Sequence, residues 1–299
     1  MKNFTLLLLF FLNFGFTQTE EVILRDNSNL HYKTFGSGKP ILIINGGPGI
    51  NCEGFGYLAE ELAKKNFKTI IYDQRGTGKS TISKANSETI TMDLMVSDIE
   101  YLRKHLKIDK WIILGHSFGG IMASYYATQH PETIEKLIFS SSGGVNMKFT
   151  NTIQEHLNNN LTQNQRDSLT YYSRKISNGD SSEETAKLRA KYLAYAYVYD
   201  KSKAEIIAER LTETNLHINS LVFADLRRIN FDCTNSFKNF KQPVLVLQGK
   251  NDIISIETAT DITKAFPNSK LILMDKCAHY GWLDANELYF NSINNFLKN

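Results

Sequence analysis

The chain is poor in features that would indicate nucleic-acid or nucleotide chemistry. The net charge of its 299 residues is only +3, and no dense block of lysine or arginine occurs. A nucleic-acid partner requires a concentrated basic face, so none is expected. No Gly-x-Gly-x-x-Gly motif follows the first strand-like runs, which argues against a dinucleotide-dependent oxidoreductase.

Cysteine is also scarce. The three cysteines are Cys52, Cys233 and Cys277, and their spacing matches no metal-binding motif. We therefore expect no metal and no other cofactor. The simplest interpretation is that they are small buried hydrophobic residues, with at most one bridge among them.

Long apolar runs are absent apart from one short run at the N-terminus. Lys2 precedes the wholly apolar Leu6–Leu12, and the small or polar Asn13, Gly15 and Thr17 follow. This order is typical of a secretory signal peptide over residues 1–17. The run is short for a membrane span of about 20 residues, so cleavage is favoured over an uncleaved anchor. The sequence thus predicts export, periplasmic or secreted, with no stable membrane insertion after cleavage.

Strand-like and helix-like segments alternate along most of the chain. An opening hairpin is expected around Asp26-Asn27. Short continuous apolar runs predict buried parallel strands, at 41–44, 69–72, 111–114, 137–139, 244–247 and 271–274. Helical patterns lie between them, at 55–65, 91–106, 118–129, 255–265 and 286–297. This order predicts an α/β fold with a mostly parallel sheet and helices on both faces.

The alternation stops between residues 143 and 240, where no comparable apolar run occurs. Thr162 with Gln165, and Asp180 with Glu183, resemble helix N-caps with a partner three residues on. We expect a helical cap over 143–240, inserted into a core formed by 18–142 and 241–299. Leu188, Tyr192, Tyr195 and Tyr199 recur at helical spacing there, which favours packing over a ligand cage.

The strongest motif is Gly115-His116-Ser117-Phe118-Gly119, between a predicted strand and a predicted helix. Gly-x-Ser-x-Gly in this setting is a nucleophile elbow, which exposes the serine at the start of a helix. Side chains in place of the two glycines would clash in so sharp a turn. Ser117 is therefore the candidate nucleophile.

A serine needs a base, and the base needs a carboxylate. Among the seven histidines, His279 lies just after the last predicted strand, and Asp252 follows the strand before it. The order Ser117, Asp252, His279 is that of α/β-hydrolases. Asp225 and Asp232 are weaker candidates because neither follows a clear strand.

A negatively charged intermediate needs N–H donors. We expect one from the backbone of Phe118, directly after the nucleophile. The other should come from the glycine-rich loop Asn45–Gly49 after the first buried strand, with Gly46 and Gly47 as candidates.

These motifs together resemble the proline iminopeptidase branch of the α/β-hydrolase superfamily. Gly46–Gly49 resembles the oxyanion loop of that family, and Asp73–Ser80 its Asp-Gln-Arg-Gly-x-Gly-x-Ser block. The resemblance implies a serine aminopeptidase acting on small peptides or amides, with Asp73 and Arg75 in a structural role. The family binds the substrate amine through cap glutamates, for which Glu205, Glu209 and Glu213 are the candidates here.

Two other functions remain open. The Gly-His-Ser-Phe elbow is more like that of general esterases, so a carboxylesterase acting on small esters is the first alternative. A catalytically inactive binding protein is the second, since fold alone does not fix function. The expected partner is a small molecule or a short peptide, and the oligomeric state is left open.

Overall fold

The computed structural model describes residues 17–25 and 28–298. The predicted signal peptide falls almost entirely on residues outside these ranges, so it stays a prediction. Within the described ranges, no helix combines the length and the apolar character that crossing a bilayer requires.

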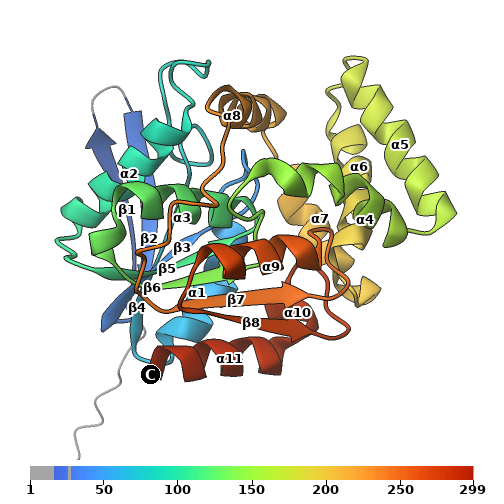
Figure 1. The fold of residues 1–299 in the computed structure, drawn as a ribbon. Helices are drawn as coiled ribbons and strands as arrows, with labels where there is room; N and C mark the ends of the chain where they lie inside the picture. Colours follow the sequence, from blue (N-terminus) through green and yellow to red (C-terminus); the bar gives the residue numbers. More distant parts are fainter. Residues whose placement is uncertain (1–16, 26–27, 299) are drawn as a thin grey trace, which may run out of the picture.

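An eight-stranded sheet forms the centre of the molecule (Figure 1). Its strand order is β1-β2-β4-β3-β5-β6-β7-β8, antiparallel at β1, β2 and β4 and parallel from β4 onward. The strands are β1 (Gln18–Arg25), β2 (Ser28–Phe35), β3 (Lys39–Ile44), β4 (Phe67–Tyr72), β5 (Trp111–His116), β6 (Ile134–Ser140), β7 (Val244–Gly249) and β8 (Ser269–Met274). The predicted α/β-hydrolase architecture is confirmed.

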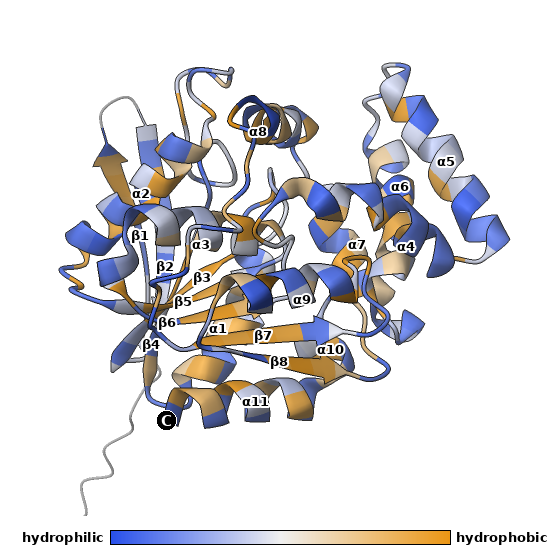
Figure 2. Ribbon diagram, in the orientation of Figure 1, coloured by the Kyte–Doolittle hydropathy of each residue, from blue (hydrophilic) through white to orange (hydrophobic). Residues whose placement is uncertain are grey.

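The central strands are apolar on both faces because helices cover both (Figure 2). In β5, Ile113 packs into the core shared with α2 (Met92–His105), α3 (Phe118–Gln129) and α9 (Ile256–Ala265). Its neighbour Ile112 faces the opposite core, shared with α1 (Gly56–Ala63) and α11 (Asn286–Lys298). The continuous apolar runs of the sequence reflect this double burial.

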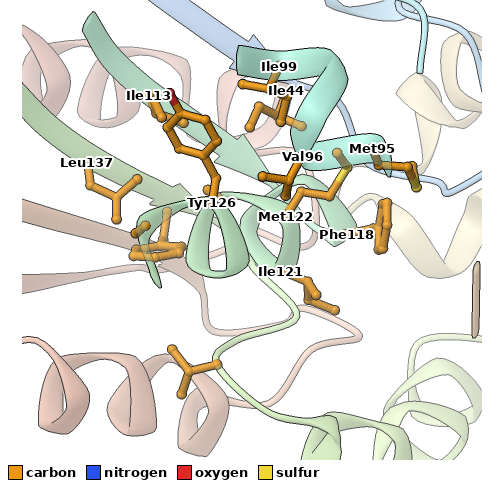
Figure 3. Close-up of a cluster of buried hydrophobic side chains, with 14 of the residues drawn as sticks. Ile44, Met95, Val96, Ile99, Ile113, Phe118, Ile121, Met122, Tyr126 and Leu137 are labelled. Atoms are coloured by element: carbon orange, nitrogen blue, oxygen red, sulfur yellow. The ribbon is translucent and has the colours of Figure 1, made fainter. Parts of the chain in front are cut away.

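Helix α3 is anchored by the core on its side of the sheet (Figure 3). Phe118, Ile121 and Met122 on α3 belong to the same buried cluster as Met95 and other apolar residues of α2. Because Phe118 is only 3% exposed, its packing fixes the first turn of the helix directly after Ser117.

The chain between β6 and β7 is helical and lies beyond one end of the central strands (Figure 1). We call residues 143–240 the helical insertion. It contains α4 (Ile153–Asn159), α5 (Gln163–Ser177), α6 (Glu183–Tyr197), α7 (Ala204–Thr212) and α8 (Leu216–Arg228), with short 3-10 turns at Met147–Asn151 and Lys201–Lys203.

Two local predictions in the insertion need correction. The box formed by Thr162 and Gln165 caps α5 as expected, but α6 is capped by Ser182, whose hydroxyl accepts from Thr185 N, and not by Asp180. Asp180 instead pairs with Lys175 and accepts from the Ser182 amide. Helix α6 also ends at Tyr197, so Tyr199 lies outside the predicted stripe and is 43% exposed.

Candidate active site

Ser117 stands at the turn between β5 and α3 with φ 55° and ψ −121°. Such a backbone is strained for a residue with a side chain, and it persists only where the surroundings enforce it. Here main-chain hydrogen bonds hold it, since Ser117 N donates to Ser140 O and Gly143 N donates to Ser117 O, both at 3.0 Å. The flanking positions have no room for a side chain, because a Cβ on Gly119 would lie 2.0 Å from Ile44 O and one on Gly115 would lie 2.5 Å from Gly119 O. The two glycines therefore allow the elbow that the motif predicts.

His279 and Asp252 meet at the ends of β8 and β7. The Nδ1 atom of His279 lies 2.7 Å from Asp252 Oδ1, and both side chains are buried. Ile254 N donates to Asp252 Oδ1 at 3.0 Å, and Gln248 Nε2 donates to Oδ2 at 2.9 Å. These hydrogen bonds hold the carboxylate in place, and the carboxylate in turn holds the His279 ring by its Nδ1 edge.

The glycine-rich loop after β3 lies directly against the elbow. A Cβ on Gly46 would be 2.7 Å from Ser117 Cβ, so only glycine permits this approach. The loop is held by Gln74, whose Nε2 donates to Asn45 O, and by Asn219, whose Nδ2 donates to Pro48 O. Phe118 is the first residue of α3, so its N–H has no partner within the helix. The candidate donors Gly46, Gly47 and Phe118 therefore lie beside Ser117.

One small cavity, of about 30 Å³, joins these elements. It is lined by Gly46, Gly47, Ile50, His116, Ser117, Tyr197, Arg210, Leu211, His279 and Tyr280. Ser117 and His279 thus share one space with the glycine-rich loop. No carboxylate is among these lining residues.

The three cap glutamates lie elsewhere. Glu205, Glu209 and Glu213 are exposed and line a larger cavity of about 720 Å³ between α6 and α7. The inner side of α7 instead presents Arg210 and Leu211 to the cavity beside Ser117. The structure thus separates these glutamates from the candidate nucleophile.

Arg210 is a site residue that the sequence analysis did not select. It is 9% exposed and lies on the same helical face as Ile207 and Leu211, both buried. The sequence does contain a signal for Arg210, namely a charged residue within an apolar stripe of a helix. Such a position is unusual because burying a charge is unfavourable unless the charge has a partner.

His116 lies in the elbow itself, but its ring packs among other aromatic rings and we do not assign it the role of base. Its ring centroid lies 4.7 Å from that of His279 and 4.8 Å from that of Trp282. Burial, reinforced by the nearby His279 and Arg210, holds the pKa of His116 well below its usual 6.5. The side chain is therefore neutral at physiological pH, and it leaves His279 as the better placed base.

Asp73 and Arg75 are buried in contacts that hold loops together. Asp73 accepts from Cys52 N and Lys79 N, both at 2.8 Å, and lies 2.7 Å from His31 Nδ1. Arg75 pairs with Asp98 on α2. All three cysteines are free and buried. His31, Cys52 and Asp73 are close enough to hold an ion, but Asp73 already makes the contacts just described.

Comparison with known protein families settles the class. The family model described as "alpha/beta hydrolase fold" matches residues 39–285. The chain belongs to this family. This hydrolase is similar to the proline iminopeptidase of Heyndrickxia coagulans, with 27% identity over 270 residues that cover 88% of this chain and 91% of the relative. It is also similar to the proline iminopeptidase of Clostridium botulinum, with 26% identity, covering 90% and 95%.

Solved structures agree on the fold of this hydrolase. VinJ superposes with a TM-score of 0.76 at 17% identity, covering 94% of this chain and 98% of that one. A structure from a study of carboxylesterases of Nitrososphaera gargenis gives a TM-score of 0.74 at 20% identity, covering 93% and 98%. The protein is thus a proline iminopeptidase-like α/β-hydrolase whose structural neighbours include esterases.

Proposed function

We propose that the protein is a serine hydrolase that cleaves a small amide or ester through an acyl-enzyme on Ser117. One observation carries the proposal: Ser117, strained at φ 55°, shares a cavity with His279, whose Nδ1 is held by Asp252. His279 takes the proton of Ser117 as the hydroxyl attacks the carbonyl, and then gives it to the leaving group. Water repeats the attack to release the acid.

The negative charge that forms on the carbonyl oxygen needs donors fixed in advance. The backbone N–H groups of Phe118 and of the Gly46–Gly47 segment supply them in this proposal. The free N–H groups and dipole at the start of α3 add to the same stabilisation.

The relatives favour an aminopeptidase of the proline iminopeptidase kind acting on small peptides or amides. One observation favours the esterase alternative. The cavity beside Ser117 is lined by a cation, Arg210, and by no carboxylate that could bind a free amine. We further propose that the protein is exported after removal of residues 1–17.

The test is turnover of the mature chain on a free-amine proline arylamide and on a short-chain nitrophenyl ester. Ser117→Ala should abolish both activities and leave the unfolding curve unchanged, because the substitution removes the nucleophile and little packing. Arylamide cleavage that is lost when the amine is blocked identifies an aminopeptidase, and ester cleavage alone identifies an esterase. Full activity of Ser117→Ala would disprove the proposed nucleophile.

A further inference from the structure

Arg210 makes two hydrogen bonds, both to neutral groups. Its Nη1 donates to the Tyr280 hydroxyl at 2.8 Å, and its Nη2 donates to Gly46 O at 3.1 Å. Its Nε is buried without a partner. Since a guanidinium carries five N–H donors, the two hydrogen bonds leave three of them without a partner among the described residues.

The positive charge of Arg210 has no counter-ion in the described part of the chain. Arg25, Arg75, Arg103 and Arg228 each pair with a carboxylate, but no ion pair involves Arg210. Tyr280 does not supply the charge, because burial raises the pKa of its phenol and keeps it neutral. The Phe55 ring, 4.9 Å from the guanidinium carbon, is a weak substitute.

The carboxylates that share a cavity with Arg210 line an outer cavity, not the one beside Ser117. Glu209 and Glu213 are two of them, and both are exposed to solvent. Glu53, on the same outer cavity, pairs with Lys33. These carboxylates therefore do not compensate the inner end of Arg210, which lines the cavity with Ser117 and His279.

Burying a charge without a partner is strongly unfavourable, so the position serves a ligand or a neighbouring group. We infer that Arg210 binds a carboxylate of the substrate, so that the hydrolase acts on acyl compounds bearing a free acid group near the scissile bond. This inference rests on the proposed function, and it names the substrate class. The Gly46 carbonyl that Arg210 holds belongs to the oxyanion loop, so the anion binds next to the reacting carbonyl.

The inference is tested with matched substrates. The mono-4-nitrophenyl esters of glutaric and adipic acid carry a free carboxylate. In their neutral twins, which have nearly the same shape, this carboxylate is a methyl ester and the 4-nitrophenyl ester is unchanged. We expect kcat/KM to favour each acid over its twin by about tenfold or more, the value of one charge-assisted hydrogen bond pair. Ser117→Ala corrects for spontaneous hydrolysis.

Substitution of Arg210 separates recognition from support of the loop. Arg210→Met should remove the preference for the acid mainly through KM, and Arg210→Lys should keep part of it. If Arg210 only supports the loop, Arg210→Met would lower kcat/KM equally for the acid and for its neutral twin. The ratio of the two kcat/KM values would then stay unchanged, and the inference would be overturned. Arg174→Met on α5 removes the same charge from an exposed position of the insertion and should leave the ratio intact.

A binding measurement distinguishes this inference from the proposed function. In Ser117→Ala, calorimetry should show monomethyl glutarate binding at least about tenfold more tightly than dimethyl glutarate, and Arg210→Met should abolish the difference. Anion binding without any turnover would retain the carboxylate site and reject the proposed hydrolysis. Equal binding of the two esters would reject the carboxylate site even if turnover is observed.

Discussion

Asp252 accepts from three groups, and this determines what its substitution does. Oδ1 faces His279 Nδ1 and Ile254 N, while Oδ2 faces Gln248 Nε2. In Asp252→Asn, one of the two carboxylate oxygens is replaced by an NH2 group, which then faces a group that is itself a hydrogen-bond donor. Either the contact with Gln248 becomes a clash of two donors, or His279 loses its acceptor and takes the wrong tautomer.

We therefore expect Asp252→Asn to lower kcat by about 10³- to 10⁴-fold while the substrate KM changes little. Steady-state kinetics on the better substrate of the two classes would measure it, beside an unfolding curve to show that the fold persists. A kcat within a few-fold of the wild type would mean that His279 takes its orientation from another group.

The buried ring of His116 makes the free energy of unfolding depend on pH. Because the pKa of His116 lies well below 6.5 in the folded protein, the unfolded chain binds the extra proton first as pH falls. The free energy of unfolding contributed by this group is complete above pH 6.5 and declines below it, toward the folded-state pKa.

His116→Phe keeps an aromatic ring in the cluster and removes the proton. The free energy of unfolding of this variant should fall less steeply between pH 6.5 and 5.5 than that of the wild type, as measured by urea denaturation. Parallel declines in the two proteins would show that His116 is not the buried titrating group.

Residue order along the chain was enough to select Ser117, Asp252 and His279, because each follows a strand whose end lies at the same edge of the sheet. Arg210 could not be found in this way. It follows no strand, and its importance depends on which face of α7 turns toward the cavity, which only the packing of the insertion determines.

At the scale of elements, the elbow between β5 and α3 leaves no room for a side chain at Gly119. Gly119→Ala would place a methyl carbon 2.0 Å from Ile44 O, and neither backbone can move away without disturbing β3. We expect a loss on the order of 3 kcal/mol in the free energy of unfolding, together with loss of activity. Chemical denaturation measures the first effect.

Gly56→Ala is the matched control. Gly56 begins α1, and a Cβ there meets nothing within 4 Å. Alanine should therefore be neutral or stabilising by up to about 1 kcal/mol. If the two variants were equally stable, the close approach at the elbow would not constrain the fold.

The predicted elements were placed well where burial is uniform and less well where it is not. β6 begins at Ile134, three residues before the predicted run of 137–139. The prediction began late because Lys136 interrupts the apolar pattern. That lysine is buried and its Nζ donates to Phe296 O and Leu297 O at the end of α11. β1 begins at Gln18, but its first four residues, 18–21, are polar and exposed, so they carry no apolar signal.

Across the whole molecule, stability is uneven. Helix α5 has no buried residue, and most of its ribbon is blue or pale in Figure 2, whereas β5 is buried along its full length. Amide hydrogens of α5 should exchange through local opening, many orders of magnitude faster than those of β5. Hydrogen exchange read by mass spectrometry would test this, and equal protection of the two segments would contradict it.

The end of the sheet beside Ser117 and His279 is joined to the helical insertion by hydrogen bonds. His279 N donates to Tyr197 O at 3.0 Å, Asn160 Nδ2 donates to Asn251 O at 2.7 Å, and Tyr199 N donates to Asp284 Oδ2 at 2.8 Å. A cavity of about 30 Å³ is far smaller than the several hundred Å³ of an ordinary ligand pocket. A substrate therefore needs more room beside Ser117 than this arrangement offers. The hydrogen bonds between the insertion and the sheet, among them the one made by the main chain of His279, oppose any movement of the insertion that would provide that room.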